Sequence, residues 1–128
     1  MIVAGIGCRR GASAGDVLEA IDAVLGEARL PADALDWIAA PAEKGGEAGI
    51  VEAAGRLNRP LVLVPPERLQ AAGARSITRS ARVVALFGVP SVAEASALAA
   101  AGDASTLLVG RHVAGAATCA LAASGPGR

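Results

Sequence analysis

Residues 1–11 read MIVAGIGCRRG, an apolar run that passes directly into a glycine-rich turn with a cysteine and two arginines. Residues 2–7 are almost entirely apolar, which is the pattern of a short strand buried on both faces. The turn carries Arg9 and Arg10, whose guanidinium groups bind carboxylates through paired hydrogen bonds. A buried strand followed by a basic glycine turn predicts one unit of an α/β fold whose first loop binds an anion.

An amphipathic helix is predicted directly after this turn, over residues 13–28, where apolar residues recur at three- and four-residue spacing. Ser13 with Asp16 forms a capping-box-like start, with Asp in place of the usual Glu or Gln. The first amides of a helix have no partner within it and carry partial positive charge. The predicted helix start therefore adds to the anion site.

The composition indicates one domain with an aliphatic core. A chain of 128 residues predicts a single domain over residues 1–124, followed by a frayed tail at 125–128. Hydrophobic residues make up 53% and aromatic residues 2%, so the core is expected to consist of Ala, Val, Leu and Ile. High Ala, Gly and Arg content is typical of a bacterial protein from a GC-rich genome.

Charge and hydropathy argue against several classes of protein. Basic and acidic residues number 12 each, which leaves no global basic field for nucleic acid. No apolar run is long enough to span a membrane, and no basic segment precedes one, so a cytoplasmic protein is expected. Cys8 and Cys119 lie far apart and outside any CxxC pattern, so no metal site is predicted. No cofactor is expected either.

Strand and helix candidates alternate along the chain. Apolar runs predict strands over residues 2–7, 35–40, 61–64, 107–109 and 116–123. Periodicity and capping signals predict helices over residues 13–28, 48–57, 67–72 and 92–101. Residues 83–87 fit either a strand or the approach to a turn, and the polar segment 73–80 predicts an exposed loop.

This alternation predicts an α/β fold, a three-layer α/β/α sandwich with a mixed, mostly parallel sheet. Residues 110–115 form a glycine-flanked basic turn between the last two strands. The turn is too short for a helical crossover, so these two strands are expected to pair antiparallel. In the parallel part, the loops after the strands meet at one edge of the sheet, where such folds bind ligands.

Three blocks of the sequence resemble the CobE family, which is similar to the C-terminal domain of CbiG, a cobalamin (vitamin B12) biosynthesis protein. Residues 5–11, GIGCRRG, are close to the family start G-I-G-C-R-[RK]-G, and residues 88–95, GVPSVAEA, resemble its G-V-x-S-V-x-E-A helix opening. Residues 107–109 precede a basic turn and a small-residue strand, and Lys44 resembles the family lysine in the loop after the second strand. The resemblance covers nearly the whole chain.

The resemblance implies a cobalamin biosynthesis protein that binds or carries a corrin-ring intermediate, with other enzymes of that pathway as further partners. Corrin precursors are flat tetrapyrroles fringed with acetate and propionate carboxylates, and a polycarboxylate needs several cationic or amide donors along one rim. The groups expected at the rim are Gly7, Cys8, Arg9, Arg10, Gly11, Lys44, Gly88, Ser91, Glu94 and Arg111. No catalytic residue is assigned.

Two other functions stay open at this point. One is an enzyme of the same pathway, with a CbiG-like cobalt-precorrin-5A hydrolase activity or a role accessory to it. The sequence contains no clear Ser/His/Asp set, paired carboxylates or metal cluster for such chemistry. The other is a module that binds a nucleotide or phosphate, which Gly5 and Gly7 support weakly because the rest of the dinucleotide fingerprint is missing.

Several candidate residues also have a purely structural interpretation. Gly5 and Gly7 fit close helix–strand packing as well as ligand approach. Cys8 is typical of a small buried residue. Lys44 fits a solvated charge, and Ser91 with Glu94 forms a full capping box. His112 and Cys119 are interpreted as an ordinary loop histidine and a core residue, respectively.

Overall fold

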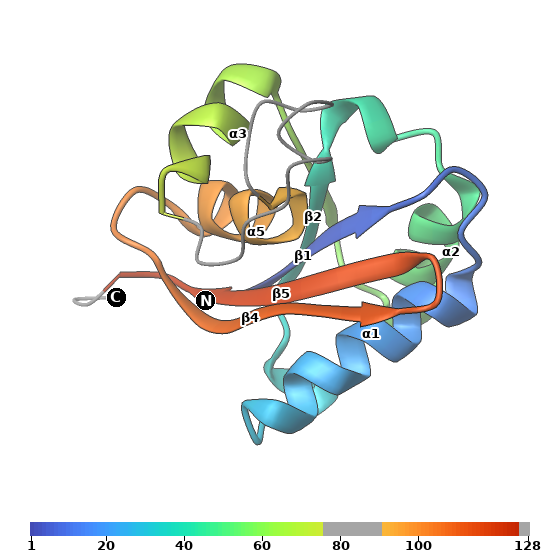
Figure 1. Cartoon of the computed structure of the whole chain (residues 1–128). Coiled ribbons are helices and arrows are strands. Elements are labelled where there is room, and N and C mark those ends of the chain that lie inside the picture. Colours follow the sequence, from blue (N-terminus) through green and yellow to red (C-terminus); the bar gives the residue numbers. More distant parts are fainter. Residues whose placement is uncertain (76–90, 126–128) are drawn as a thin grey trace.

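A computed structural model describes residues 1–75 and 91–125. The described residues form a five-stranded sheet in the order β3-β2-β1-β5-β4 (Figure 1). The strands are β1 (Ile2–Cys8), β2 (Trp37–Pro41), β3 (Leu61–Val64), β4 (Thr106–Ala114) and β5 (Ala117–Ala123). The helices are α1 (Ala14–Glu27), α2 (Ala48–Leu57), α3 (Pro66–Gly73) and α5 (Val92–Ala101), with short 3-10 turns η1 (Ala32–Ala34) and η2 (Ala42–Lys44).

The sheet is mixed, as the sequence predicts. β1 pairs parallel with β2, and β2 pairs parallel with β3. β5 pairs antiparallel with both β1 and β4, so β4 runs in the direction of β1. A tight turn at Gly115 and Ala116 joins β4 to β5, and Gly115 has the positive φ of 57° that such turns require. The predicted antiparallel pairing of the last two strands is therefore confirmed.

The helices cover both faces of the sheet (Figure 1), which confirms the three-layer prediction. α1 and α2 enclose one apolar core, and α3 and α5 enclose the other. β1 lies at the centre and contributes Ile6 to the first core and Val3 to the second, both fully buried. Its almost continuous apolar sequence follows from this burial on both faces.

Apart from β4, the predicted helices and strands that fall on described residues begin and end within two residues of the observed ones. β4 is longer than predicted, because Arg111 and His112 belong to the strand rather than to the turn that follows it. Their backbone continues the ladder with β5, in which His112 lies opposite Cys119. An edge strand tolerates such polar side chains, and the register shifts around Val109 mark a bulge there.

Some predictions fall on residues outside the described ranges. These are the candidate strand at residues 83–87, residues 76–80 of the predicted loop, Gly88, and the end of the predicted tail at 126–128.

Gly5 sets the position of α5 on the sheet. A β-carbon at Gly5 would lie 2.1 Å from the Ala93 carbonyl oxygen and 2.5 Å from the Ala97 amide nitrogen. One at Gly7 would lie 2.7 Å from the Thr118 hydroxyl oxygen. The contacts at Gly5 favour the packing interpretation of that glycine, because helix backbone lies directly against strand backbone there.

Candidate functional site

The carboxyl ends of β1 and β2 lie side by side at one edge of the sheet, which we call the carboxyl edge. It comprises the loop at residues 9–13 after β1, the loop at residues 42–47 after β2, the β4–β5 turn at residues 115–116, and Ser91 at the start of α5. Parallel strands necessarily bring their following loops to the same edge. Most of the predicted ligand-binding residues fall on these segments or directly beside them.

The first two loops are in direct contact. The Gly11 amide donates a hydrogen bond of 3.1 Å to Oε1 of Glu47. The first turn of α2 packs so closely on the first loop that a β-carbon at Gly49 would lie 2.1 Å from the Ala12 carbonyl oxygen. The arginine-bearing loop and the lysine-bearing loop therefore form one continuous surface.

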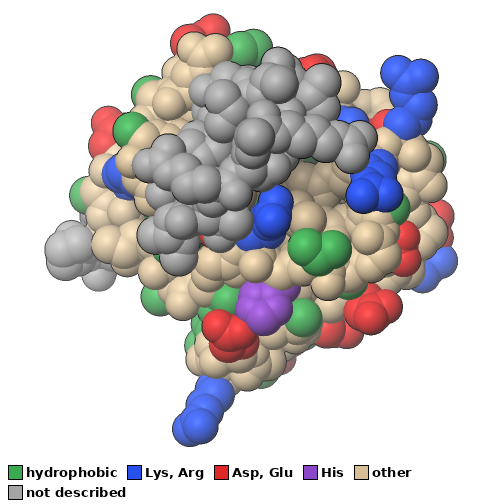
Figure 2. All heavy atoms as spheres, viewed as in Figure 1, with side chains coloured by type: hydrophobic (Ala, Val, Ile, Leu, Met, Phe, Trp, Pro, Cys, Tyr) green, Lys and Arg blue, Asp and Glu red, His purple; other side chains and the backbone are tan. Residues whose placement is uncertain are grey.

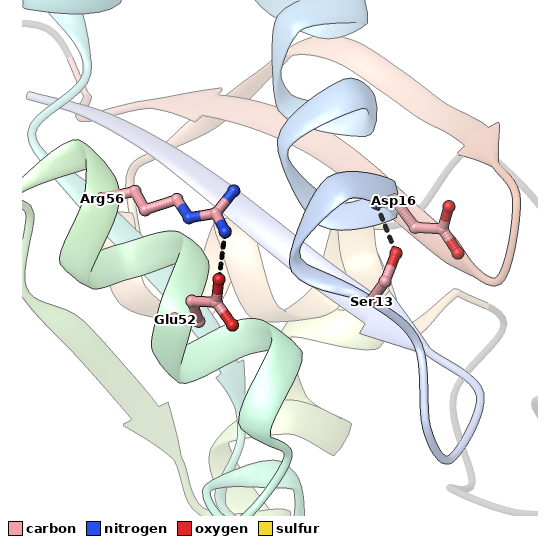
Figure 3. A network of polar contacts seen from close by, with 4 residues as sticks. All are labelled: Ser13, Asp16, Glu52 and Arg56. Carbon is pink, nitrogen blue, oxygen red and sulfur yellow. Dashed lines mark hydrogen bonds and ion pairs between the residues drawn. The ribbon is translucent and has the colours of Figure 1, made fainter.

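The β4–β5 turn is fixed to the first loop on its other side. The Arg9 amide donates to the Ala116 carbonyl at 2.9 Å. The Ala116 amide in turn donates to Oδ2 of Asp16 at 3.1 Å. Figure 3 shows Asp16 extending from the first turn of α1, with its amide bound to the Ser13 hydroxyl. Gly115 leaves room for this carboxylate, since a β-carbon there would lie 2.5 Å from Oδ1 of Asp16.

The start of α5 approaches the same edge from the opposite face of the sheet. The Ser91 hydroxyl caps the helix by accepting the Glu94 amide at 3.3 Å. Val92 lies over the end of β1, with its Cβ 3.6 Å from the position of a β-carbon on Gly7. Glu94 is fully buried, and its Oε2 accepts the Arg111 amide of β4 at 2.9 Å.

Arg111 and the first loop thus belong to the same part of the molecule. β5 separates β4 from β1, and Arg111 lies a few residues before the turn that binds Arg9. Glu94 and Ser91 are both completely buried, whereas Arg9, Arg10 and Gly11 are exposed. The ligand-binding roles of these residues stay predictions.

His112 directly follows Arg111 in β4, but its side chain contacts α1 instead of the loops of the carboxyl edge. Its Nε2 is 2.5 Å from Oε1 of Glu27 in the last turn of α1. Figure 2 shows the histidine, in purple, beside an acidic side chain. His112 therefore lies in β4 and not in the loop that its sequence context predicts.

The carboxyl edge is not uniformly basic. In Figure 2 basic and acidic side chains lie interspersed on the right-hand side, where β1 ends in Figure 1. Glu43 and Glu47 share the second loop with Lys44. Any anionic ligand at this edge would meet carboxylates as well as cations.

One cavity lies outside the carboxyl edge, between α3 and the end of α5, and has a volume of about 240 Å³. Two arginines in its wall are already engaged by backbone carbonyls: Arg68 donates to Ala99 at 3.1 Å, and Arg75 to Ser105 at 2.8 Å. These bonds satisfy carbonyls at and just beyond the end of a helix, so the two arginines have a structural role here.

The described residues include no group of three or more His, Cys, Asp or Glu side chains arranged to hold a metal ion. They also include no helix long and apolar enough to cross a membrane. Cys8 and Cys119 are both free thiols. Cys119 is fully buried, as the sequence predicts, and burial raises its pKa far above the ordinary value.

Cys8 is half-buried at the end of β1. Burial raises the pKa of its thiol, the Lys44 ammonium opposes this rise, and the Glu47 carboxylate adds to it. Because the net effect is a raised pKa, the thiol stays protonated at neutral pH. The two opposing charges also indicate that Cys8, Lys44 and Glu47 lie close together.

The reactivity of Cys8 follows from its raised pKa. At pH 7 iodoacetamide should alkylate Cys8 more slowly than it alkylates the thiol of free glutathione. The rate at Cys8 should keep rising beyond pH about 8.5, because only the thiolate reacts. Lys44→Ala should slow the reaction and Glu47→Gln should speed it. Peptide mass spectrometry over a pH series measures both rates. A rate that levels off below pH 8 would contradict the raised pKa.

Two important contacts were absent from the sequence-based predictions. Glu47 binds the Gly11 amide, and Asp16 binds the Ala116 amide 100 residues away. The pattern Ser13–Asp16 indicates only the local cap, and that cap is present. A signal for Glu47 exists in its position, because Glu directly before a helix is a poor N-cap and its side chain is available for another partner.

Comparison with known proteins identifies the family of the chain. The family described as cobalamin synthesis G C-terminus matches residues 2–122 of the chain. A protein named CobE from Sinorhizobium sp. is 31% identical over 121 residues, which cover 94% of this chain and 79% of that protein.

Solved structures agree with this assignment. The chain is similar to the crystal structure of CobE, a protein from the cobalamin (vitamin B12) biosynthetic pathway, with a TM-score of 0.89 and 36% identity over 95% of this chain and 89% of that one. It is also similar to the cobalamin biosynthesis protein chiG from Agrobacterium tumefaciens str. C58, with a TM-score of 0.76 and 36% identity over 97% and 98% of the two chains. The chain therefore belongs to the cobalamin synthesis G C-terminus family and is a cobalamin biosynthesis protein.

Proposed function

We propose that this protein binds a polycarboxylate corrin-ring intermediate along the carboxyl edge. Its family belongs to cobalamin biosynthesis, whose intermediates are corrin rings fringed with acetate and propionate carboxylates. Such a ligand is wide and flat. It requires several donors spread along a rim rather than one deep basic pocket.

The observation that carries this proposal is the contact between the two loops that follow β1 and β2. The Gly11–Glu47 hydrogen bond places Arg9 and Arg10 on one surface with Lys44. The bond from the Arg9 amide to Ala116 adds the β4–β5 turn to that surface. Exposed guanidinium groups pair with carboxylates in two parallel hydrogen bonds, which suits the acid fringe of a corrin.

Helix starts support the same proposal. α1 and α2 both begin directly after loops of the carboxyl edge. The partial positive charge of each helix start favours a nearby carboxylate by about 0.3–1 kcal/mol. These contributions offset part of the repulsion between a ligand carboxylate and the acidic side chains at this edge.

Gel filtration with a coloured ligand tests the proposal. The protein is mixed with cobyrinic acid, a corrin with free acetate and propionate carboxylates, or with cobinamide, in which such side chains are amides. We expect cobyrinic acid to co-elute and cobinamide to separate. Equal retention of both would contradict carboxylate recognition. The alternative is that the protein is an enzyme of the same pathway. Mass spectrometry of pathway intermediates recovered from the column tests it, because an enzyme would change the mass of its substrate.

Substitution of the cations should weaken this binding selectively. Arg9→Ala and Arg111→Ala should each reduce the affinity for cobyrinic acid by about 1–3 kcal/mol if their side chains pair with ligand carboxylates. Arg56→Ala is the matched control, because Arg56 pairs with Glu52 on α2, near the end of the helix that is remote from the carboxyl edge (Figure 3). Absorbance titration measures all three affinities. Unchanged affinity in both Arg9→Ala and Arg111→Ala would contradict binding of the ligand carboxylates along the carboxyl edge.

A further inference from the structure

We propose that Glu47 is an internal competitor at the carboxyl edge: its carboxylate occupies the Gly11 amide, and a carboxylate of the ligand displaces it on binding. This inference rests on the proposed function and adds a self-occupied state to it. The bond concerned is the 3.1 Å hydrogen bond from the Gly11 amide to Oε1 of Glu47. It is a carboxylate already bound to the loop that is proposed to bind carboxylates.

The position of Glu47 argues that this contact is not an ordinary helix cap. Glu47 is the N-cap residue of α2, yet its side chain forms no capping hydrogen bond there. The carboxylate reaches instead to a loop 36 residues earlier in the chain. The amides of the first turn of α2 therefore receive no capping hydrogen bond from the Glu47 side chain.

Exchange of the two carboxylates needs little reorganisation. The bond is exposed and Glu47 is only half-buried, so water and ligand reach it from outside the protein. The loop itself is held by other contacts, namely the bond from the Arg9 amide to Ala116 and the packing of Gly49 on Ala12. Once displaced, the Glu47 carboxylate can turn to the amides at the start of its own helix, where negative charge is favoured.

Removal of Glu47 would also change the charge that the ligand meets. Glu47 adds a negative charge near Lys44 and Cys8, as the effects of both residues on the Cys8 thiol indicate. A dianionic or more highly charged ligand is repelled by it. Glu47→Ala should therefore improve affinity twice, by freeing the amide and by removing repulsion. Glu47→Gln removes the repulsion but retains an acceptor oxygen, so it only weakens the bond to the Gly11 amide.

The test compares two carboxylates of the same loop. Glu47→Gln and Glu43→Gln remove the same charge, but Glu43 is an exposed residue of η2 and only Glu47 binds Gly11. We expect Glu47→Ala to bind cobyrinic acid about tenfold more tightly than Glu43→Gln, because alanine releases one charge-assisted hydrogen bond. Glu47→Gln should also bind more tightly than Glu43→Gln, but by less, because its amide oxygen is a weaker acceptor for the Gly11 amide. Glu47→Ala should also bind more tightly than wild type. If Glu47 merely held the loop in place, both Glu47 variants would bind as weakly as Glu43→Gln or more weakly.

A second measurement keeps the inference testable if the corrin proposal fails. Tricarballylate, a small tricarboxylate, is titrated into ¹⁵N-labelled protein, and the Gly11 amide resonance is followed by NMR. The resonance should respond at a lower tricarballylate concentration in Glu47→Gln than in wild type or Glu43→Gln. Equal midpoints, or no response in any of the three, would overturn the competitor role. Loss of cobyrinic acid binding with a retained midpoint shift would instead overturn only the identity of the ligand.

Discussion

Gly5→Ala should lower the free energy of unfolding by about 3 kcal/mol, the upper end of the usual range for overpacked sites. The added β-carbon would lie 2.1 Å from the Ala93 carbonyl oxygen and 2.5 Å from the Ala97 amide nitrogen. Both atoms belong to the backbone of α5, which cannot rotate away as a flexible side chain would. The helix must shift off β1, and the fully buried side chains between them lose contact.

Urea denaturation followed by circular dichroism measures this change. Gly55→Ala is the matched control, because Gly55 lies inside α2 and a β-carbon there would meet nothing within 4 Å. Alanine favours a helix over glycine, so this variant should gain about 0.5–1 kcal/mol. The same chemical change thus has opposite signs at the two positions. If Gly5→Ala were as stable as wild type, α5 would not be packed on β1 as described.

The behaviour of Gly5 also illustrates what the sequence could and could not predict. The apolar run around it predicts a buried strand, and β1 is buried on both faces. The glycine itself fits either packing or ligand approach, because both need a bare backbone. The position of α5, a helix that begins 87 residues later, favours packing over ligand approach.

For polar residues near turns, the sequence likewise predicts local hydrogen bonds but not partners that lie far away in the chain. Ser13 and Asp16 predict a local cap, and the hydroxyl–amide bond of that cap is present. The Asp16 carboxylate, however, binds the β4–β5 turn, a partner that a short pattern cannot specify. Arg111 and His112 were predicted in a turn because they are polar and glycine-flanked. They extend an edge strand instead, since strand pairing depends on β5 rather than on their own side chains.

The convergence of the carboxyl-edge loops was predictable in outline. Parallel strands bring their following loops together whatever the loop sequences are, so residues after β1 and β2 had to be neighbours. The acid that links them was not predictable, because Glu47 reaches across a gap of 36 residues through its side chain alone. The basic residues of the two loops, taken without Glu47, therefore overstate how basic the edge is.

Glu94→Ala should lower the free energy of unfolding by about 2–4 kcal/mol. Glu94 is fully buried, and its Oε2 accepts the Arg111 amide from β4. Alanine would leave a cavity and remove the acceptor of an amide on the inner side of the strand. Asp16 makes a corresponding bond to Ala116 from the opposite face of the sheet, so the two acids hold the β4–β5 hairpin from both sides.

Glu94→Gln is the matched control, because glutamine removes the charge but has the same shape and retains an acceptor oxygen for the Arg111 amide. It should lose only about 1 kcal/mol, and Glu52→Ala on the exposed face of α2 less than about 0.5 kcal/mol. Hydrogen exchange gives the local readout: the Arg111 amide should exchange faster in Glu94→Ala and near the wild-type rate in Glu94→Gln. If Glu94→Ala and Glu94→Gln lowered the free energy of unfolding equally and left exchange at Arg111 unchanged, the hydrogen bond between Glu94 and Arg111 would not stabilise the hairpin. Under the proposed function, this hydrogen bond also fixes Arg111 relative to the carboxyl edge. Glu94→Ala should therefore weaken cobyrinic acid binding even at temperatures where the protein is fully folded.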